Sequence, residues 1–222
     1  GALCAENGVL FHTDAIQWFG KLPLVGVADF QADLVSLCAH KFHGPKGAGL
    51  LYAKSPLNPD PILHGGAHEN ERRAGTENLP AILGLADAIV QFVPSPAFPM
   101  AQLGEWSNLL IDSVDSIEGA SFIGDRDPNG RLNNTVSFIV EDSDSIALLS
   151  GLDLVGICAS SGSACSSGSV TPSHVVKALG APDSSANALV RFSLGRETSL
   201  EEVKLVADFL PRVVAQARGA NK

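Results

Sequence analysis

The chain has 222 residues, of which 45% are hydrophobic and 18% are charged, with 22 glycines and 13 prolines. This composition is typical of a folded globular protein and excludes a disordered, collagen-like or low-complexity chain. Acidic residues outnumber basic residues 24 to 15, which gives a net charge of −9. The sequence shows no dense basic segment, so nucleic-acid binding is not expected. The length predicts one or two domains.

Cysteine usage and the apolar segments bear on the compartment. The four cysteines, at positions 4, 38, 158 and 165, form no CxxC pair and no disulfide framework, so we expect reduced thiols in a cytoplasmic protein. The longest apolar stretch, 79–93, is interrupted by Asp87 and is too short to span a bilayer. The histidines form no HExxH motif or zinc spacing, and we expect no metal. The start, GALCAENGVL, is neither a Met start nor a signal peptide, which we interpret as a beginning inside a longer protein.

The first part of the chain alternates strand and helix signals. Apolar runs predict strands at 9–11, 33–37 and 49–53, and residues 77–92 predict a helix capped by Asn78. This alternation favours an α/β layer with a mostly parallel sheet. The proline-rich segment 93–99 breaks all regular structure, and we place a domain boundary there, with domains over 1–95 and 96–222.

The second part has the pattern of a small α+β domain. Residues 102–117 predict an amphipathic helix, residues 135–140 and 189–194 predict half-buried strands, and residues 173–179 predict a short helix. The sequence Ser199-Leu-Glu-Glu202 is a capping box that opens a last helix ending near Ala217, with Pro211 expected to kink it.

Asp14 and Lys41 are the first candidate site residues. Each follows an apolar run, so each is expected at the carboxyl end of a strand, where open α/β sheets build ligand sites. Either residue alone is usually a solvated loop residue. Together, a carboxylate for a pyridinium nitrogen and a lysine for a Schiff base are the minimal apparatus for pyridoxal 5'-phosphate (PLP).

Cys165 is the second candidate. It lies in the polar segment Ser160–Ser169, in which Ala164 is the largest apolar residue next to it. We therefore interpret Cys165 as an accessible nucleophile or sulfur carrier. An incidental surface cysteine is the alternative. Cys158, which follows an apolar run, is expected to be a small buried hydrophobe.

Two further features could bind anions. Arg191 and Ser193 share one face of a predicted strand, where the arginine could clamp a carboxylate or form a surface ion pair. The glycine-rich segment 64–78, ahead of a helix, could bind phosphate through Thr76 and backbone amides or could be an ordinary turn.

Five motifs occurring in this order closely resemble the cysteine desulfurases of the NifS/IscS type. The motifs are FHTDA at 11–15, AHKFHGPKG at 39–47, RAGTEN at 73–78, SGSACSSG at 161–168 and RFSLGR at 191–196. The resemblance implies the aspartate aminotransferase fold, class V, with the rear part of the large PLP-binding domain followed by the small C-terminal domain. The long serine-rich cysteine loop resembles the NifS/IscS branch rather than the SufS branch.

The resemblance implies a cofactor-binding role for five residues. Lys41 would bind PLP covalently and shuttle protons, Asp14 would pair with the pyridinium nitrogen, and Gln17 would touch the phenolic oxygen. His40 would contact the cofactor phosphate, and Thr76 would reach the phosphate bound by the partner subunit of a homodimer.

The resemblance also implies the reaction. Arg191 would hold the carboxylate of L-cysteine, and Cys165 would take its sulfur as a persulfide, leaving alanine. The sulfur would then pass to an acceptor such as an iron–sulfur scaffold or to a thio-modification system. The alternatives are a selenocysteine lyase, another class V relative, or an inert fragment that only binds a sulfur acceptor.

Two departures from the family pattern stand out. Relatives carry serine as a phosphate ligand three residues before the lysine, where this chain has Cys38, a weaker donor. The family's N-terminal portion, which supplies further cofactor contacts, has no counterpart in these 222 residues. We therefore expect the chain alone to bind PLP weakly and to desulfurate cysteine poorly.

Overall fold

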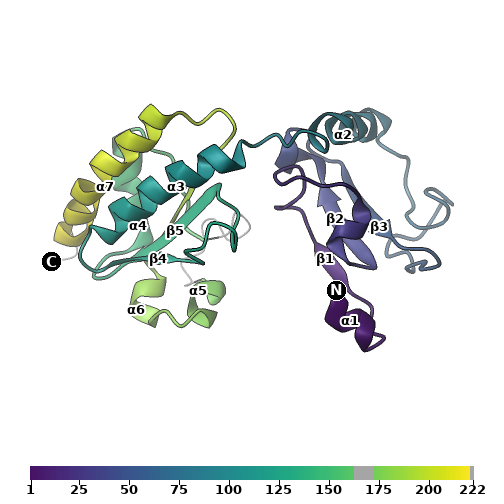
Figure 1. Ribbon diagram of the computed structural model, residues 1–222, viewed down its shortest axis with the longest axis horizontal. Helices are drawn as coiled ribbons and strands as arrows, with labels where there is room; N and C mark the ends of the chain where they lie inside the picture. The colour runs from purple at the N-terminus through teal and green to yellow at the C-terminus, as the bar shows by residue number, and fades with distance from the viewer. Residues whose placement is uncertain (163–172, 221–222) are drawn as a thin grey trace. The chain divides into compact units, whose positions relative to one another are not determined.

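The computed structural model describes residues 1–162 and 173–220. The chain divides into two compact units, Gly1–Pro99 and Met100–Lys222. Figure 1 shows the helices and strands of each, and each unit is described by itself below. No helix in the described part of the chain combines the length and the apolar character needed to cross a membrane.

The first unit is built on a three-stranded sheet of order β1-β2-β3. Its elements are α1 (Ala2–Glu6), β1 (His12–Asp14), the 3-10 helix η1 (Val27–Phe30), β2 (Leu34–Cys38), the 3-10 helix η2 (Ala39–Phe42), β3 (Gly49–Ala53) and α2 (Leu79–Phe92). Strands β1 and β2 are parallel, with Asp14 opposite Ser36. The mixed α/β class of the unit confirms the predicted fold class.

The predicted strand over 9–11 is wrong, because the ladder starts at His12. Val9 and Leu10 are exposed, and the Val9 amide donates to the Cys4 carbonyl instead of a strand. Phe11 sets the start of the ladder, since its amide donates to the Asp33 carboxylate at 3.0 Å. Strand β2 begins one residue later than predicted, whereas β3 has the predicted bounds.

The sheet of the first unit is not mostly parallel, as the alternation of strands and helices suggested. Strand β3 is antiparallel to β2, with Cys38 opposite Gly49. The connection from Cys38 to Gly49 is a short loop that contains only the single turn η2. A parallel return would need a crossover of a dozen or more residues, so this loop forces the antiparallel pairing.

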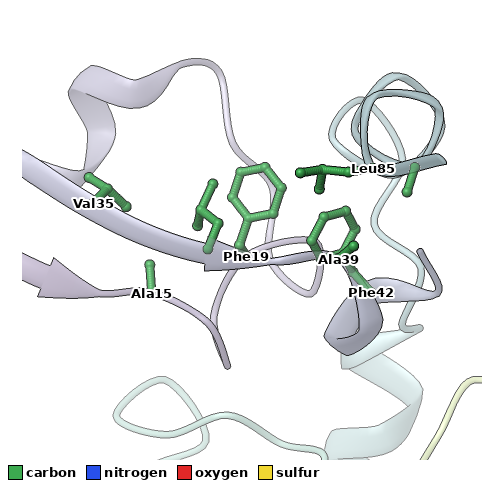
Figure 2. Close-up of a cluster of buried hydrophobic side chains, with 8 residues drawn as sticks. Ala15, Phe19, Val35, Ala39, Phe42 and Leu85 are labelled. Atoms are coloured by element: carbon green, nitrogen blue, oxygen red, sulfur yellow. The ribbon is translucent and has the colours of Figure 1, made fainter. Parts of the chain in front are cut away.

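The core of the first unit packs against strand β2. Val35 and Leu37 alternate inward along β2 and meet Phe19, Phe42 and the α2 residue Leu85, with three alanines completing the cluster (Figure 2). The rings of Phe19 and Phe42 pack edge to face with centroids 5.0 Å apart. Phe42 is fully buried, so the turn after β2 is anchored to the core.

Helix α2 contributes Leu85 and Ala88 to this core. Asn78 caps it as predicted, accepting from the Ala81 amide at 3.3 Å, and Pro80 lies in its first turn. Gly84 allows close approach to the loop after η2, because a Cβ there would lie 2.9 Å from Pro45. The helix therefore holds the loop after Lys41 in place.

The second unit is a three-stranded antiparallel sheet of order β4-β5-β6 with helices. Its elements are α3 (Met100–Asp115), β4 (Ala120–Ile123), β5 (Thr135–Val140), α4 (Ser145–Leu154), α5 (His174–Ala178), α6 (Asp183–Ala186), β6 (Leu189–Ser193) and α7 (Leu200–Ala220). Helix α3 contacts β4, β5 and α7, and α4 contacts β6 and α7. A smaller cluster joins Ile139 and Leu189 to Val176 of α5 and Ala186 of α6.

Most elements predicted in the second unit are confirmed, with ends shifted by one to three residues. Strand β5 has the predicted bounds, and Ser173 caps α5. The capping box is present, because the Ser199 amide donates to Glu202 at 2.7 Å and the Glu202 amide donates to Ser199 at 3.2 Å. Helix α7 continues through Pro211. The short strand β4, in which only four residues pair, has no clear sequence signal and was not predicted.

Gly20 provides a test of how tightly the turn is anchored. Its φ is +73°, and a Cβ there would lie 2.5 Å from the Phe42 Cβ, whereas Gly8 has a similar φ of +65° with open space around it. Left-handed strain costs an alanine about 1–2 kcal/mol, and overpacking adds about 1–3 kcal/mol. We expect Gly20→Ala to lower the free energy of unfolding by about 2–5 kcal/mol and Gly8→Ala by about 1–2 kcal/mol.

The measurement is urea unfolding followed by Trp18 fluorescence in a Trp106→Phe background, which isolates the signal of the first unit. Equal losses for the two alanine variants would show that the contact between Gly20 and Phe42 does not constrain the turn.

Candidate functional site

Asp14 and Lys41 lie at the same edge of the first sheet. Asp14 is the last residue of β1, and Lys41 lies in η2, three residues after the end of β2. Because β1 and β2 are parallel neighbours, their carboxyl ends meet at one edge, which is where α/β sheets place ligands. The structure therefore brings these two predicted residues together.

The backbone around Lys41 is held by buried neighbours. Ala39 and Phe42, which flank Lys41 in η2, are fully buried. His43 ends the turn in the left-handed conformation with φ +69°, and its ring stacks on Phe98 with centroids 5.5 Å apart. Lys41 itself is half-buried, so a fixed backbone presents its amine at the edge of the sheet.

Asp14 is oriented by the chain that follows it. Its Oδ1 accepts a hydrogen bond from the Ile16 amide at 3.0 Å, while the side chain is exposed. On the same face of the sheet, His12 Nε2 lies 2.8 Å from the Ser36 hydroxyl. The face opposite the core thus carries a carboxylate, an imidazole and a hydroxyl.

Gln17 is tied to a buried lysine that the sequence analysis did not single out. Lys21 is only 4% exposed, and its Nζ donates to the Gln17 Oε1 at 2.7 Å. Burial, together with the nearby Lys41 charge, lowers the pKa of Lys21 to about 8, with Cys38 acting in the opposite direction. Gln17, Lys21, Lys41 and Cys38 therefore form one cluster.

The remaining cofactor candidates of the first unit are more exposed. His40 lies in η2 and is exposed, and Cys38 is half-buried at the end of β2. Cys38 shares the outward face of β2 with Ser36, since Val35 and Leu37 face the core. These placements keep both side chains near the Lys41 turn.

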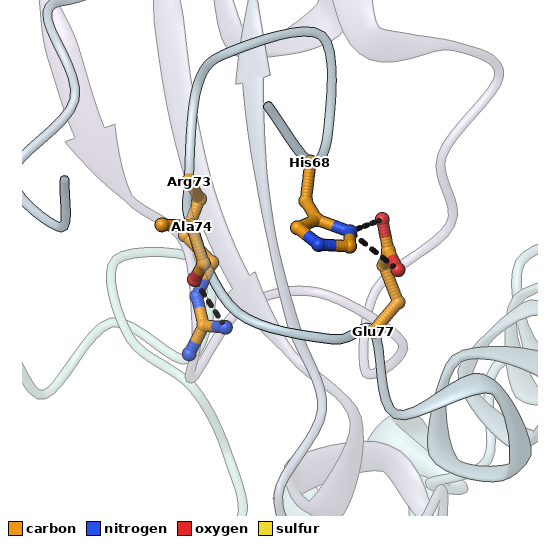
Figure 3. A network of polar contacts seen from close by, with 4 residues as sticks. All are labelled: His68, Arg73, Ala74 and Glu77. Carbon is orange, nitrogen blue, oxygen red and sulfur yellow. Dashed lines mark hydrogen bonds and ion pairs between the residues drawn. The ribbon is translucent and has the colours of Figure 1, made fainter. Parts of the chain in front are cut away.

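Thr76 is exposed in the glycine-rich segment before α2. Figure 3 shows the polar contacts of this segment, in which His68 Nδ1 lies 3.0 Å from Glu77 Oε1 and Arg73 donates to the Ala74 carbonyl. Hydrogen bonds from its own backbone amide and from His68 lower the pKa of Glu77. These bonds shape the segment, and no described contact links it to Asp14 or Lys41.

Arg191 lies on β6 with the predicted alternation. Val190 and Phe192 are buried on one face, whereas Arg191 is half-buried and Ser193 exposed on the other. The Nε of Arg191 is buried and has no hydrogen-bond partner among the described residues. Because leaving such a donor unpaired is unfavourable, the guanidinium fits a ligand with acceptor oxygens.

Cys165 lies outside the described residues, so its predicted role is not tested. The approach to it is described up to Gly162, and Ser160 pairs with Arg191 through two backbone hydrogen bonds of 3.1 and 2.7 Å. Cys158 is exposed, which corrects the expectation that it is buried. The preceding residue, Ile157, is buried instead of Cys158.

The residues at the sheet edge fit PLP. A primary amine on Lys41 and a carboxylate on Asp14 are the groups that PLP requires, and the Gln17 amide adds a donor. Within residues 1–162 and 173–220, no group of three or more His, Cys, Asp or Glu side chains is placed to hold a metal ion.

Lys21 is the site residue that sequence reasoning missed. Its only sequence signal is the four-residue spacing from Gln17, in a segment that contains Gly20 and is followed by Pro23. The segment forms turns rather than a helix, so the burial of Lys21 follows from tertiary packing, not from a local pattern.

Comparisons with known proteins identify the family to which the chain is similar. The family model described as aminotransferase class-V matches residues 1–206. A cysteine desulfurase of Rhodobacter capsulatus is 41% identical over 211 residues, covering 95% of this chain and 54% of the relative. The cysteine desulfurase NifS of Azotobacter vinelandii is 39% identical over 219 residues, which cover 99% of this chain and 54% of the relative.

A solved structure shows the same fold. The X-ray structure of a NifS-like protein from Rickettsia africae matches with a TM-score of 0.82 and 24% identity, covering 96% of this chain and 56% of that one. The chain spans about half the length of the curated relatives it matches. With the family model matching nearly all of its length and the fold matching as well, the chain belongs to the class-V aminotransferase family.

Proposed function

We propose that this chain carries the lysine, the carboxylate and the sulfur-accepting cysteine of a PLP-dependent cysteine desulfurase. The observation that carries the proposal is the placement of Asp14 and Lys41 at the carboxyl ends of two parallel neighbouring strands. The proposal is supported by relatives named cysteine desulfurase at 37–41% identity. None of those names favours a selenocysteine lyase or an inert binding fragment.

The residues of the first unit would hold the cofactor and move protons. PLP, when bound, supplies an electron sink that lets bonds at the substrate α- and β-carbons break. Asp14 would keep the ring nitrogen protonated, since a carboxylate favours the charged form of a neighbouring base. Lys41 would hold the cofactor through its Nζ. When substrate frees that amine, the Lys41 Nζ would carry a proton.

The cluster around Lys41 also supports binding of the other polar groups of PLP. The Gln17 amide would donate to the phenolic oxygen, while the exposed His40 would contact the phosphate. Thr76 would serve the phosphate held by the partner subunit. Cys38 would occupy a phosphate-ligand position with a weaker donor than a hydroxyl.

The second unit would bind the substrate and accept its sulfur. Arg191 would hold the carboxylate of L-cysteine, a role supported by its buried Nε, which has no hydrogen-bond partner within residues 1–162 and 173–220. The Cys165 thiolate would attack the substrate sulfur, so that an S–S bond forms as the substrate C–S bond breaks. The substrate β-carbon would take up a proton, so that the substrate leaves as alanine while its sulfur remains as a persulfide on Cys165.

We also propose the setting in which this activity works. A homodimer would complete the phosphate site through Thr76, and a sulfur-acceptor protein such as an iron–sulfur scaffold would remove the persulfide sulfur. Free thiols at Cys4, Cys38 and Cys158 support a reducing compartment such as the cytoplasm.

Lys41→Ala and Cys165→Ser should fail at different steps. Lys41→Ala should abolish the visible absorbance of bound PLP and the borohydride-fixed label on the peptide that contains residue 41. Cys165→Ser should retain both signals and yet form no persulfide from L-cysteine. If Cys165→Ser releases sulfide at the unmutated rate, Cys165 is not the sulfur acceptor.

Arg191→Ala should weaken the capture of cysteine. A hydrogen bond to a charged group contributes about 1.5–3 kcal/mol, so kcat/KM should fall about 10- to 150-fold. Arg191→Lys should restore little, because lysine lacks the bidentate fork. Steady-state alanine formation measures both variants, with Arg196→Ala, a half-exposed arginine of the same segment, as the matched control. An unchanged kcat/KM in Arg191→Ala would remove Arg191 from the substrate site.

A further inference from the structure

Lys21 is a buried cation without a carboxylate partner in the described part of the chain. It is 4% exposed, and its recorded contacts are the 2.7 Å hydrogen bond to Gln17 and a position 5.3 Å from the centre of the Phe98 ring. Burying an unpaired ammonium group is costly. The hydrogen bond to Gln17 and the position over the Phe98 ring are therefore the interactions that offset the cost of burying Lys21.

The chemistry of the two side chains fixes the orientation of the Gln17 amide. An ammonium group has three donors and no acceptor, whereas a glutamine amide has one accepting oxygen and one donating NH₂. The contact at 2.7 Å therefore requires the amide oxygen to face Lys21. The NH₂ group then faces away from Lys21, and no described residue accepts a hydrogen bond from it.

We propose that Lys21 is a positioning residue that locks the Gln17 amide with its NH₂ group toward the cofactor, where it donates to an anionic oxygen. This inference rests on the proposed function, because the resemblance assigns Gln17 to the phenolic oxygen of PLP. Without Lys21, the amide rotates freely between two orientations, one of which presents its oxygen to the anion and repels it.

Burial keeps Lys21 committed to Gln17. The ring of Phe98 covers the ammonium group, and that ring is itself stacked on His43 beside the Lys41 turn. The pKa of Lys21 is lowered to about 8 by burial and by Lys41. The lock belongs to the charged form of Lys21, because a neutral amine carries a lone pair that can also accept a hydrogen bond from the Gln17 NH₂ group.

The test is a double-mutant cycle on PLP binding. Lys21→Met keeps the unbranched stem that fills the site and removes the donor. We expect Lys21→Met to raise the Kd for PLP about 2- to 10-fold, the equivalent of one hydrogen bond, and to shift the visible absorbance of the bound cofactor. Gln17→Ala should give the same spectral shift, and the double variant should be no worse than the more affected single variant.

Several outcomes overturn the inference. One is a Lys21→Met variant with the Kd and spectrum of the unmutated protein. Another is a double variant whose losses add, which would mean that Lys21 acts on Lys41 or the cofactor without Gln17. Lys54→Met, which removes an exposed lysine of the same unit, is the control for charge and should change neither readout.

A cofactor-free measurement separates this inference from the proposed function. In the unmutated protein without PLP, nuclear Overhauser contacts should connect the Lys21 side chain to the Gln17 methylenes but not to the Gln17 NH₂ protons. Contacts to those NH₂ protons would overturn the lock, whether or not Lys21→Met folds. The amide orientation can be as expected while PLP does not bind Lys41 or cysteine yields no alanine. In that case the proposed function fails, but the contact between Lys21 and the Gln17 amide oxygen is confirmed.

Discussion

The burial of Phe42 is the constraint on which the site of the first unit depends. The chain leaves β2, makes one 3-10 turn and places the Phe42 ring against Phe19 in the core. Lys41 is the residue immediately before this anchor, so its amine is presented at the sheet edge without freedom in the backbone. The same anchor fixes the short loop that makes β3 antiparallel, and it leaves room only for glycine at position 20.

The fixed turn matters for the reaction proposed for Lys41, because the lysine amine must bind and release the cofactor while its backbone stays in place. A side chain on a mobile loop would lose part of the advantage of proximity, since effective molarity depends on a small set of geometries. Helix α2 reinforces the turn through Leu85 and through the close approach of Gly84 to Pro45. The site is thus supported from the core side, while Asp14 and His40 are exposed.

Local signals in the sequence predicted three of the capped helices but not α4, which Asp144 caps, and they predicted the strand relationships poorly. Asn78, Ser173 and the Ser199–Glu202 box each satisfy amides within three residues, so their outcome is decided locally. The start of β1 depends on the Asp33 carboxylate, which is distant in the sequence. For the same reason the exposure of Cys158 and the burial of Lys21 were missed, because tertiary packing, not residue type, determines them.

The two hydrogen bonds between Ser160 and Arg191 tether the predicted sulfur carrier to the residue proposed to bind substrate. Five peptide units separate Ser160 from Cys165, and a fully extended chain of that length spans at most about 18 Å. Position 165 is thus linked by chain length alone to the strand that carries Arg191, whatever conformation the intervening residues adopt. For the proposed reaction, the number of residues after Ser160 therefore limits how far from this strand a sulfur acceptor could meet position 165.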